Sequence, residues 1–170
     1  MIIGKTVRIR YPELVEIGNN VIIDDFTYIS TQLIIHSYVH IASGCKLIGG
    51  KEAKIELHDF STLAPGVVLA AGSDDYISGI ASPLVPLKFK GNVQIGKIII
   101  GKHSVVGANS IVLPNVIFNE GASIGALSLV KNNLEEWLLY AGIPAKKIKK
   151  RNKQMIIKLE KQFYEESKDE

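Results

Sequence analysis

The chain has 170 residues, of which 46% are hydrophobic and 22% are charged. These proportions are ordinary for a globular protein and exclude a disordered chain, a collagen and a disulfide-rich scaffold. The length predicts one domain with a buried core. The single cysteine, Cys45, excludes an intrachain disulfide, which fits a reducing cytoplasm.

The positive charge of the chain is concentrated near its C-terminus. The net charge is +3, but six of the 20 basic residues lie between positions 146 and 153. The rest of the chain has 14 basic and 17 acidic residues, so it is mildly acidic. This distribution predicts one contact with an anion near the C-terminus and argues against a nucleic-acid-binding face. No apolar run approaches the roughly 20 residues of a membrane helix, and no signal peptide is evident, so membrane insertion is not expected.

Isoleucine and valine together number 38, and the chain has 15 glycines. Beta-branched residues favour strands, and frequent glycines favour tight turns. Few aromatic residues are present to fill a large core. The composition therefore predicts a repetitive β architecture.

A six-residue repeat runs along the chain from residue 15 to residue 131. Large aliphatic or aromatic residues recur at every sixth position, in three runs: Ile17, Ile23, Ile29, Ile35, Ile41, Leu47; Leu57, Leu63, Leu69; and Ile100, Val106, Val112, Phe118, Ile124, Val130. A second column of smaller residues, such as Cys45, Ser61 and Ser104, lies two positions earlier. We expect both columns to point inward, with a short strand and a turn in each six residues.

Three such segments close one triangular coil, and several coils must stack because a single coil buries almost nothing. A period of two, typical of an antiparallel sandwich, does not explain a period of six. The predicted fold is mainly β, with an N-terminal cap at 1–14, a stack of triangular coils at 15–131 and a C-terminal tail at 132–170.

The repeat is interrupted at three places, where we expect function to lie. Residues 49–54 add four residues at a turn, and residues 73–92 form a long loop without a repeat of its own. In the tail, residues 132–139 are predicted to form a short helix and residues 152–167 a longer amphipathic one. The last residues, 165–170, are expected to fray.

The hexapeptide pattern resembles the hexapeptide-repeat acyltransferase family, whose fold is the left-handed parallel β-helix. The resemblance covers residues 15–72 and 93–131, and the ending Tyr140-Ala-Gly-Ile-Pro-Ala-Lys-Lys-Ile-Lys-Lys-Arg151 is similar to the C-terminal signature of the acetyltransferase branch. It implies transfer of an acetyl group from acetyl-CoA without a metal. It also implies a homotrimer with active sites between subunits, where the long loop covers the site of a neighbour.

In this family a histidine commonly acts as the general base. The resemblance favours His40 for this role, because it lies one to two coils before the loop. The alternative is that His40 has no catalytic role and is either exposed to solvent or buried between subunits. His36, Ser43 and Glu52 lie on nearby turns and are weaker candidates for contacts with the acceptor.

The loop begins with Ser73-Asp74-Asp75-Tyr76, where maltose and galactoside acetyltransferases carry a histidine. This stretch and the preceding Asp59–Leu69 look more like the subgroup that acts on nucleotide-linked 4-amino-4,6-dideoxy sugars. An amine can attack a thioester without a strong base, so Asp74, Asp75 and Tyr76 are candidates for orienting it. The alternative is that these residues only cap a turn.

The resemblance also marks residues for coenzyme A. Small turn residues let the backbone approach the pantetheine arm, and basic residues meet the phosphates. The matched positions are Ala108, Asn109, Ala126, Ser128, Lys131, Gly142, Pro144, Ala145, Lys146, Lys147 and Arg151.

N-acetylation of a nucleotide-linked amino sugar for bacterial surface polysaccharide is therefore the first expectation. Sugar O-acetylation with a histidine base is the second, and a non-catalytic β-helix scaffold is the third. A γ-carbonic anhydrase shares the fold but needs a His-x4-His pair and a third histidine in register. His36 and His40 are separated by three residues, which does not match that pattern.

Overall fold

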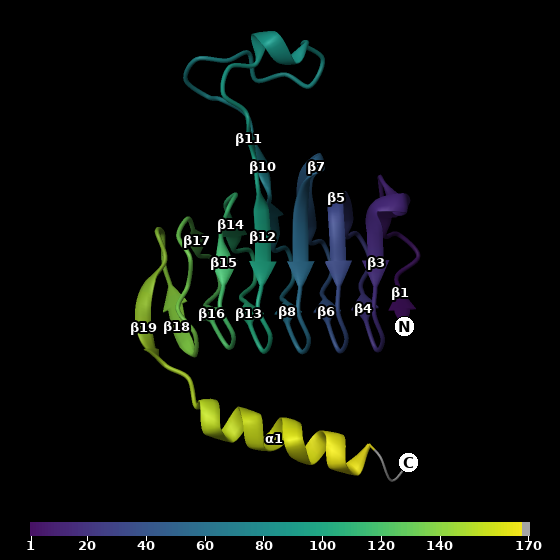
Figure 1. The fold of residues 1–170 in the computed structure, drawn as a ribbon, viewed down its shortest axis with the longest axis vertical. Coiled ribbons are helices and arrows are strands. Elements are labelled where there is room, and N and C mark those ends of the chain that lie inside the picture. The colour runs from purple at the N-terminus through teal and green to yellow at the C-terminus, as the bar shows by residue number, and fades with distance from the viewer. Residues whose placement is uncertain (168–170) are drawn as a thin grey trace.

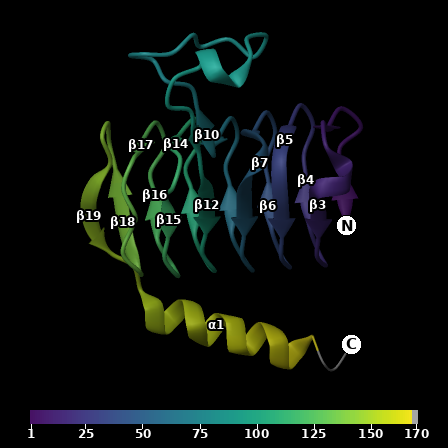
Figure 2. The same cartoon turned by 45° about the horizontal axis from the view of Figure 1, so that its top comes forward.

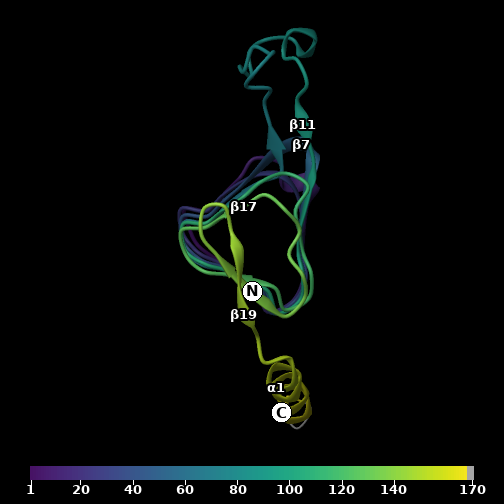
Figure 3. The same cartoon turned by 90° about the vertical axis from the view of Figure 1, so that its left-hand side faces the viewer.

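The structure is a computed structural model that describes residues 1–167. Its short parallel strands stack in successive coils along one axis (Figure 1). Seen along that axis, each coil is a roughly three-sided ring, with a long loop leaving one corner and a helix lying beyond another (Figure 3). The predicted left-handed parallel β-helix is confirmed.

Each coil contributes one strand to each of three faces. Face 1 contains β1 (Ile2–Ile3), β4 (Ile22–Ile23), β6 (His40–Ile41), β8 (Thr62–Leu63), β13 (Val105–Val106), β16 (Ser123–Ile124) and β18 (Leu138–Ala141). Face 2 contains β2 (Arg8–Ile9), β9 (Val68–Ala70), β14 (Ile111–Val112), β17 (Leu129–Val130) and the first parts of two long strands, β5 (Tyr28–Ile35) and β7 (Lys46–Leu57).

Face 3 contains the second parts of β5 and β7, together with β3 (Val15–Ile17), β12 (Lys97–Ile100) and β15 (Ile117–Phe118). The register keeps equivalent residues together, so Ile35 pairs with Leu57, and Leu57 pairs with Ile100. The pairing of Ile2 with Ile22 shows that stacking with the coils already begins at the N-terminus. A single-turn 3-10 helix follows β2 at Pro12–Leu14.

The core is the interior of the prism. Fourteen of the fifteen residues predicted as the main inward column are buried, and the exception is Ile17, which is partly buried at the N-terminal end. The smaller column is buried from Val21 to Ser128 as well. Stacking removes these side chains from water, at roughly 25 cal/mol per Å² of apolar surface.

The three corners of the prism differ, and each is named here. The small-residue corner joins faces 1 and 2, the arm corner joins faces 2 and 3, and the helix corner joins faces 3 and 1. The arm corner carries residues 73–92, called the arm below. The arm stands on a two-stranded antiparallel stalk of β10 (Gly72–Ser73) and β11 (Gln94–Ile95), and contains a 3-10 turn at Leu87–Phe89.

The helix α1 (Lys153–Glu166) runs back along the helix corner beside the coils (Figure 2). The Asn152 side chain caps it by accepting a hydrogen bond from the Met155 N–H at 3.0 Å, so the predicted longer helix is confirmed. Glu165 and Glu166, which are expected to fray, belong to its last turn in the structure, and residues 168–170 lie outside the described part. Among the described residues, no helix combines the length and hydrophobicity that crossing a membrane requires.

The short helix predicted at 132–139 is wrong. This segment continues the coil, because Leu134 bridges to Phe118 on face 3, and Tyr140 of β18 pairs with Ile124 on face 1. The strand β19 (Lys146–Lys150) then pairs antiparallel with β18 and closes the C-terminal end of face 1. The buried side chains of Leu134 and Leu138 extend the inward columns, which outweighs the local helical preference of the sequence.

Candidate active site

The site begins at the stalk of the arm. Gly72 pairs with Ile95 and Ser73 with Gln94 in antiparallel register. A Cβ atom on Gly72 would lie 2.9 Å from the carbonyl oxygen of Gly49, so the glycine lets the stalk pass close to the neighbouring coil. The stalk therefore holds Ser73 and Gln94 beside face 2.

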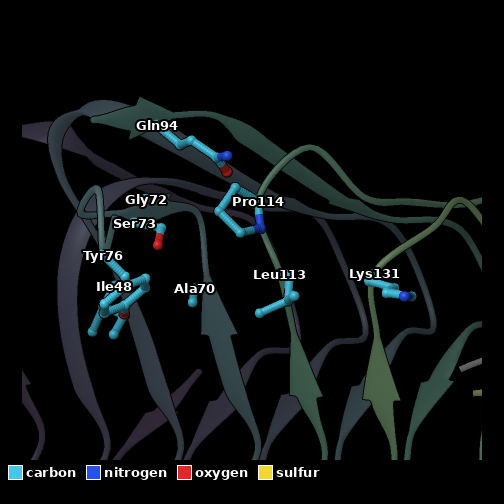
Figure 4. A pocket seen from close by; sticks show the side chains of 9 residues that line it. All are labelled: Ile48, Ala70, Gly72, Ser73, Tyr76, Gln94, Leu113, Pro114 and Lys131. Carbon is cyan, nitrogen blue, oxygen red and sulfur yellow. The ribbon is translucent and has the colours of Figure 1, made fainter. Parts of the chain in front are cut away.

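A hollow of about 390 Å³ lies between this stalk and face 2 (Figure 4). Residues from successive coils of face 2 line its floor, namely Ile48, Ala70, Leu113 and Lys131. The stalk and the arm supply polar side chains at its rim: Ser73, Tyr76 and Gln94. The hollow brings Lys131, expected on the coenzyme A side, together with Tyr76, expected on the acceptor side.

Two further hollows share Ser73 and Gln94 with the first. One, of about 500 Å³, is lined by the start of the arm, including Asp74 and Asp75. The other, of about 630 Å³, lies at the arm corner and is lined by charged side chains of both signs: Arg10, Lys51, Glu52, Asp74 and Lys90. We call these three hollows together the arm-base site.

Asp75 holds the arm in its fold. Its Oδ1 accepts hydrogen bonds from the N–H groups of Ile77 and Ser78 at 2.9 and 3.0 Å, and its Oδ2 accepts one from Asn92 at 3.0 Å. These bonds, led by the one from Asn92, lower the pKa of Asp75. Gly91 lies against the carboxylate at a φ of +67°, where an added Cβ would meet Oδ2 at 2.5 Å.

Asp74 has a different environment from its neighbour. Its Oδ1 forms an ion pair with the Lys90 Nζ at 2.9 Å, and its side chain is 36% exposed within two of the hollows. Among the contacts of the described residues, its Oδ2 has no partner. The two candidate carboxylates therefore differ in environment, because Asp75 accepts three hydrogen bonds from the arm backbone, whereas Asp74 faces the site.

His40 lies on face 1, and it lines none of the three hollows. Its Nε2 lies 2.8 Å from the Asp24 Oδ2, and both side chains are 43% exposed. A histidine oriented by a carboxylate has the geometry of a general base. Within one chain, however, the fold does not bring His40 to Asp74. Ser43 is exposed on the small-residue corner and also lies outside the hollows.

His36 belongs to a cluster on face 3, away from the arm-base site. Its Nε2 and that of His58 each lie 3.3 Å from the Oε1 of Glu56. Among the described residues, these three form the one group of donors near enough to hold a metal ion. Burial lowers the pKa of His58, which favours its neutral form.

The small-residue corner carries the turns expected to meet coenzyme A. Asn109 and Leu127 take the left-handed conformation, with φ of 54° each, and the Leu127 N–H donates to the Ala108 carbonyl at 2.8 Å. Gly107 lies against the next turn, where an added Cβ would meet the Ala126 nitrogen at 2.4 Å. The corner is therefore a ladder of closely stacked turns, with Asn109, Ala126 and the larger Leu127 exposed.

The C-terminal signature crosses this same corner. Ser128 is buried, and its Oγ accepts a hydrogen bond from the Gly142 N–H at 3.0 Å. The Ala145 N–H donates to the Leu129 carbonyl at 2.8 Å, so residues 142–145, with Pro144 exposed, lie beside the turns. Ser128 thus has a clear structural contact rather than an exposed side chain.

The basic tail divides into two parts. Lys146 and Lys147 lie on the exposed strand β19, and the Lys147 Nζ lies 3.3 Å from the Oε2 of Glu135. The Arg151 guanidinium instead donates to the carbonyls of His103 and Gly121, each at 2.7 Å. These two bonds fix the root of α1 to the helix corner.

Sequence reasoning missed Arg10, Lys90 and Gln94 at the arm-base site. Arg10 precedes the repeat, and the other two lie in or after the arm, where periodicity carries no information. A hydrogen bond with Tyr28 is the main cause of the raised pKa of Arg10, so the guanidinium is charged. The position of Lys90 beside Gly91, where the loop leads back to the coils, is the one feature of the sequence that could have indicated it.

Comparisons with known proteins agree with this geometry. No protein-family model matches the chain. It is 42% identical over 147 residues to a dTDP-4-amino-4,6-dideoxy-D-glucose acyltransferase of Escherichia coli, covering 84% of this chain and 74% of that protein.

Two solved structures complete the comparison. AntD, an N-acyltransferase from Bacillus cereus solved with dTDP and 3-hydroxybutyryl-CoA, superposes with a TM-score of 0.92 at 40% identity, over 98% of this chain and 87% of AntD. A maltose O-acetyltransferase of Clostridium difficile superposes with a TM-score of 0.60 at 19% identity, over 89% of this chain and 66% of that one, which shows a shared fold.

The fold and the arm-base site, with these likenesses, define a left-handed β-helix enzyme that transfers acyl groups from coenzyme A. The expected enzyme class and cofactor are confirmed. More narrowly, the chain belongs to the hexapeptide-repeat acyltransferase family that includes dTDP-4-amino-4,6-dideoxy-D-glucose acyltransferase.

Proposed function

We propose that this enzyme transfers an acetyl group from acetyl-CoA to the 4-amino group of a dTDP-linked 4-amino-4,6-dideoxyhexose. The observation that carries the proposal is the half-exposed carboxylate of Asp74, which faces the arm-base site from a loop held by Asp75. The Escherichia coli relative is named for such a sugar, and a variant of AntD was solved with dTDP-4-amino-4,6-dideoxyglucose and coenzyme A.

The charges of the site fit both ends of this acceptor. Arg10 and Lys51 supply positive charge for a diphosphate, and Asp74, which is paired with Lys90, supplies a hydrogen-bond acceptor for an amine. When the amine nitrogen attacks the thioester carbonyl carbon, a C–N bond forms, the C–S bond breaks and coenzyme A leaves as a thiolate. The proton that the nitrogen loses passes to this sulfur, so the products are an amide and free coenzyme A. A carboxylate beside that nitrogen stabilises the positive charge that develops on it.

The thioester binds, in our proposal, along the small-residue corner. The exposed turn residues Asn109 and Ala126, with the partly buried Ala108, leave room there for the pantetheine arm beside the backbone. Lys146 and Lys147 on β19 are exposed and suited to the phosphates, whereas Arg151 is occupied by two carbonyl groups. Lys131, which lines the first hollow, is the cation between the two halves of the site.

A homotrimer follows as part of the proposal. The arm exposes apolar side chains, among them Ile77 at 95% and Leu84 at 92%. Such a surface is costly on a single chain in water, and packing against a neighbouring subunit removes that cost. The same assembly is one route by which His40 of one subunit and the arm of another meet in one cleft.

We also place the enzyme in the cytoplasm, where acyl-CoA and nucleotide sugars are made, and in the assembly of bacterial surface polysaccharide. The support is its likeness to enzymes of nucleotide-sugar modification and to a putative lipopolysaccharide O-acetyl transferase of Escherichia coli, 31% identical over 74% of this chain and 61% of that protein.

The proposal is tested by thiol release from acetyl-CoA with two matched acceptors. One is dTDP-4-amino-4,6-dideoxyglucose, and the other is the same nucleotide sugar with a 4-hydroxyl group. We expect release with the amine and a product that carries an amide. Release with the hydroxyl sugar alone, or with neither sugar, contradicts the proposal. 3-Hydroxybutyryl-CoA in a parallel reaction decides whether acetyl is the preferred acyl group.

Sugar O-acetylation is the second candidate, and one observation favours it. The 2.8 Å contact between His40 and Asp24 is the arrangement that activates a hydroxyl group. For N-acetylation, turnover of His40→Ala should stay within a few-fold of the wild type, because an amine needs no strong base. A loss of about 100-fold, typical for removal of a general base, favours the O-acetyl reaction.

A further inference from the structure

A metal-ligating cluster lies on face 3, outside the arm-base site and its chemistry. Leu57 and Ile35 occupy equivalent positions of neighbouring coils, so the residues that follow them, His58 and His36, lie one above the other. Their rings stack with centroids 4.7 Å apart and planes inclined by 17°. Glu56 precedes Leu57 on the outer side of β7 and lies next to both rings.

The distances fit a small tetrahedral site. Each Nε2 lies 3.3 Å from the Oε1 of Glu56, and all three donor atoms lie within 4.8 Å of one another. Bonds of about 2.0–2.1 Å from a central Zn²⁺ place adjacent tetrahedral ligands roughly 3.3 Å apart. In the absence of an ion, such a contact is a long hydrogen bond, and its length also matches the spacing of two ligands that share one ion.

The surroundings hold the carboxylate in place. The Oε2 of Glu56 lies 3.3 Å from the Lys97 Nζ and 3.8 Å from the Lys54 Nζ, whereas its Oε1 faces the histidines. Ligating carboxylates are commonly held in this way by a second layer of polar groups. The Glu56 side chain is 17% exposed, and the two histidines are about 40% exposed, so the ligands are ordered and an ion can still enter.

We propose that His36, Glu56 and His58 bind one divalent transition-metal ion, of the class of Zn²⁺ or Ni²⁺, on each chain. Two imidazole nitrogens and one carboxylate oxygen are ligands that such ions prefer over Mg²⁺ or Ca²⁺. The ion links the coil that contains His36 to the next coil. It therefore stabilises the prism and takes no part in acyl transfer.

The test is a titration of the untagged full-length protein with ZnCl₂ alone, followed by calorimetry and by thermal unfolding. We expect one ion per chain and a rise in the unfolding temperature, because the ion binds the folded state. We expect each of three single variants to weaken zinc binding at least tenfold: His36→Asn, His58→Asn and Glu56→Gln. Removing a residue that only supports a metal ligand already costs about tenfold or more in affinity, so removing a ligand itself should cost at least as much. MgCl₂ should not bind.

His40→Asn is the matched control for this titration, because it removes an exposed histidine that pairs with a single carboxylate. Its zinc affinity should equal that of the wild type. The proposal is overturned if the wild type shows no saturable binding below about 1 mM, or if the three cluster variants bind as well as His40→Asn. Unfolding curves without metal identify any variant that fails to fold, and each remaining cluster variant tests the site independently.

Discussion

Asp74 and Asp75 are adjacent in sequence, yet their carboxylates have separate tasks. Asp75 accepts three backbone hydrogen bonds within the arm, and Asp74 forms one ion pair and faces the site. The sequence singled out this pair as chemically important but could not assign the tasks. The difference depends on how residues 76–92 fold back onto Asp75, and no periodic pattern encodes that.

Cys45 offers a residue-scale prediction. Its side chain is fully buried, and burial raises the pKa of its thiol to about 11. Because the thiolate is the reactive form, we expect no reaction of the native protein with dithionitrobenzoate at about pH 8. After unfolding in guanidinium chloride, one thiol per chain should react. Rapid labelling of the native protein contradicts the buried placement, and it would also add background to a thiol-release assay.

At the scale of elements, the strands were predictable and the C-terminal segments only partly so. A period of six identifies inward residues without knowledge of the partner strand, because each residue stacks on its own equivalent. Residues 132–139 lie past the last clear repeat, so their local helical preference was the misleading signal. The coil beneath them supplies a template for Leu134 and Tyr140 that only the folded structure reveals.

Helix α1 provides a prediction about pH. Glu160 forms an ion pair with Lys102, and its Oε2 lies 2.8 Å from the His103 Nε2. Burial raises the pKa of Glu160, but hydrogen bonds from Lys102 and His103 outweigh it, so the pKa falls below the ordinary 4.5. The stabilisation is therefore present above pH 4.5 and is lost as the pH falls through the lowered pKa.

Glu160→Gln should accordingly lower the free energy of unfolding at neutral pH by about 1.5–3 kcal/mol, the contribution of a charged hydrogen bond, and with it the unfolding temperature. The curves of variant and wild type should converge in acid. Fluorescence of Trp137, the single tryptophan, reports the change, because this residue lies against His103 at the root of the helix. Glu165→Gln on the same helix is the control. A constant difference at all pH values contradicts the assignment.

At the scale of the molecule, the three corners of the prism differ in structure. Helix α1 lies along the helix corner, the small-residue corner presents stacked turns, and the arm corner carries the three hollows of the arm-base site. The sequence predicted where the coils break but could not place the corners around the axis. The sequence favours His40 because it precedes the loop by one to two coils, although in one chain it lies on face 1, away from Asp74 at the arm corner. The catalytic role of His40 stays a prediction.

The exposed apolar arm leads to a prediction about assembly. Replacing Ile77 and Leu84 together by serine removes two apolar side chains that the proposed trimer buries. We expect a smaller trimer fraction in light scattering after gel filtration, and a fall in kcat/KM for the acceptor. Lys88→Ser, a polar change on the same arm, should have little effect on either. An unchanged trimer and unchanged kinetics in the double variant contradict the role of the arm.

The central claim is that the arm-base site binds the acceptor amine through Asp74. Its most direct test is kcat/KM for the dTDP-linked amino sugar in Asp74→Asn, compared with Lys90→Met, which breaks the same ion pair but keeps the carboxylate. A lost charged hydrogen bond of about 1.5–3 kcal/mol corresponds to roughly a ten- to hundredfold decrease. We predict that decrease for Asp74→Asn and a clearly smaller one for Lys90→Met. Equal losses in the two variants, or a value for Asp74→Asn within about twofold of the wild type, contradict the account.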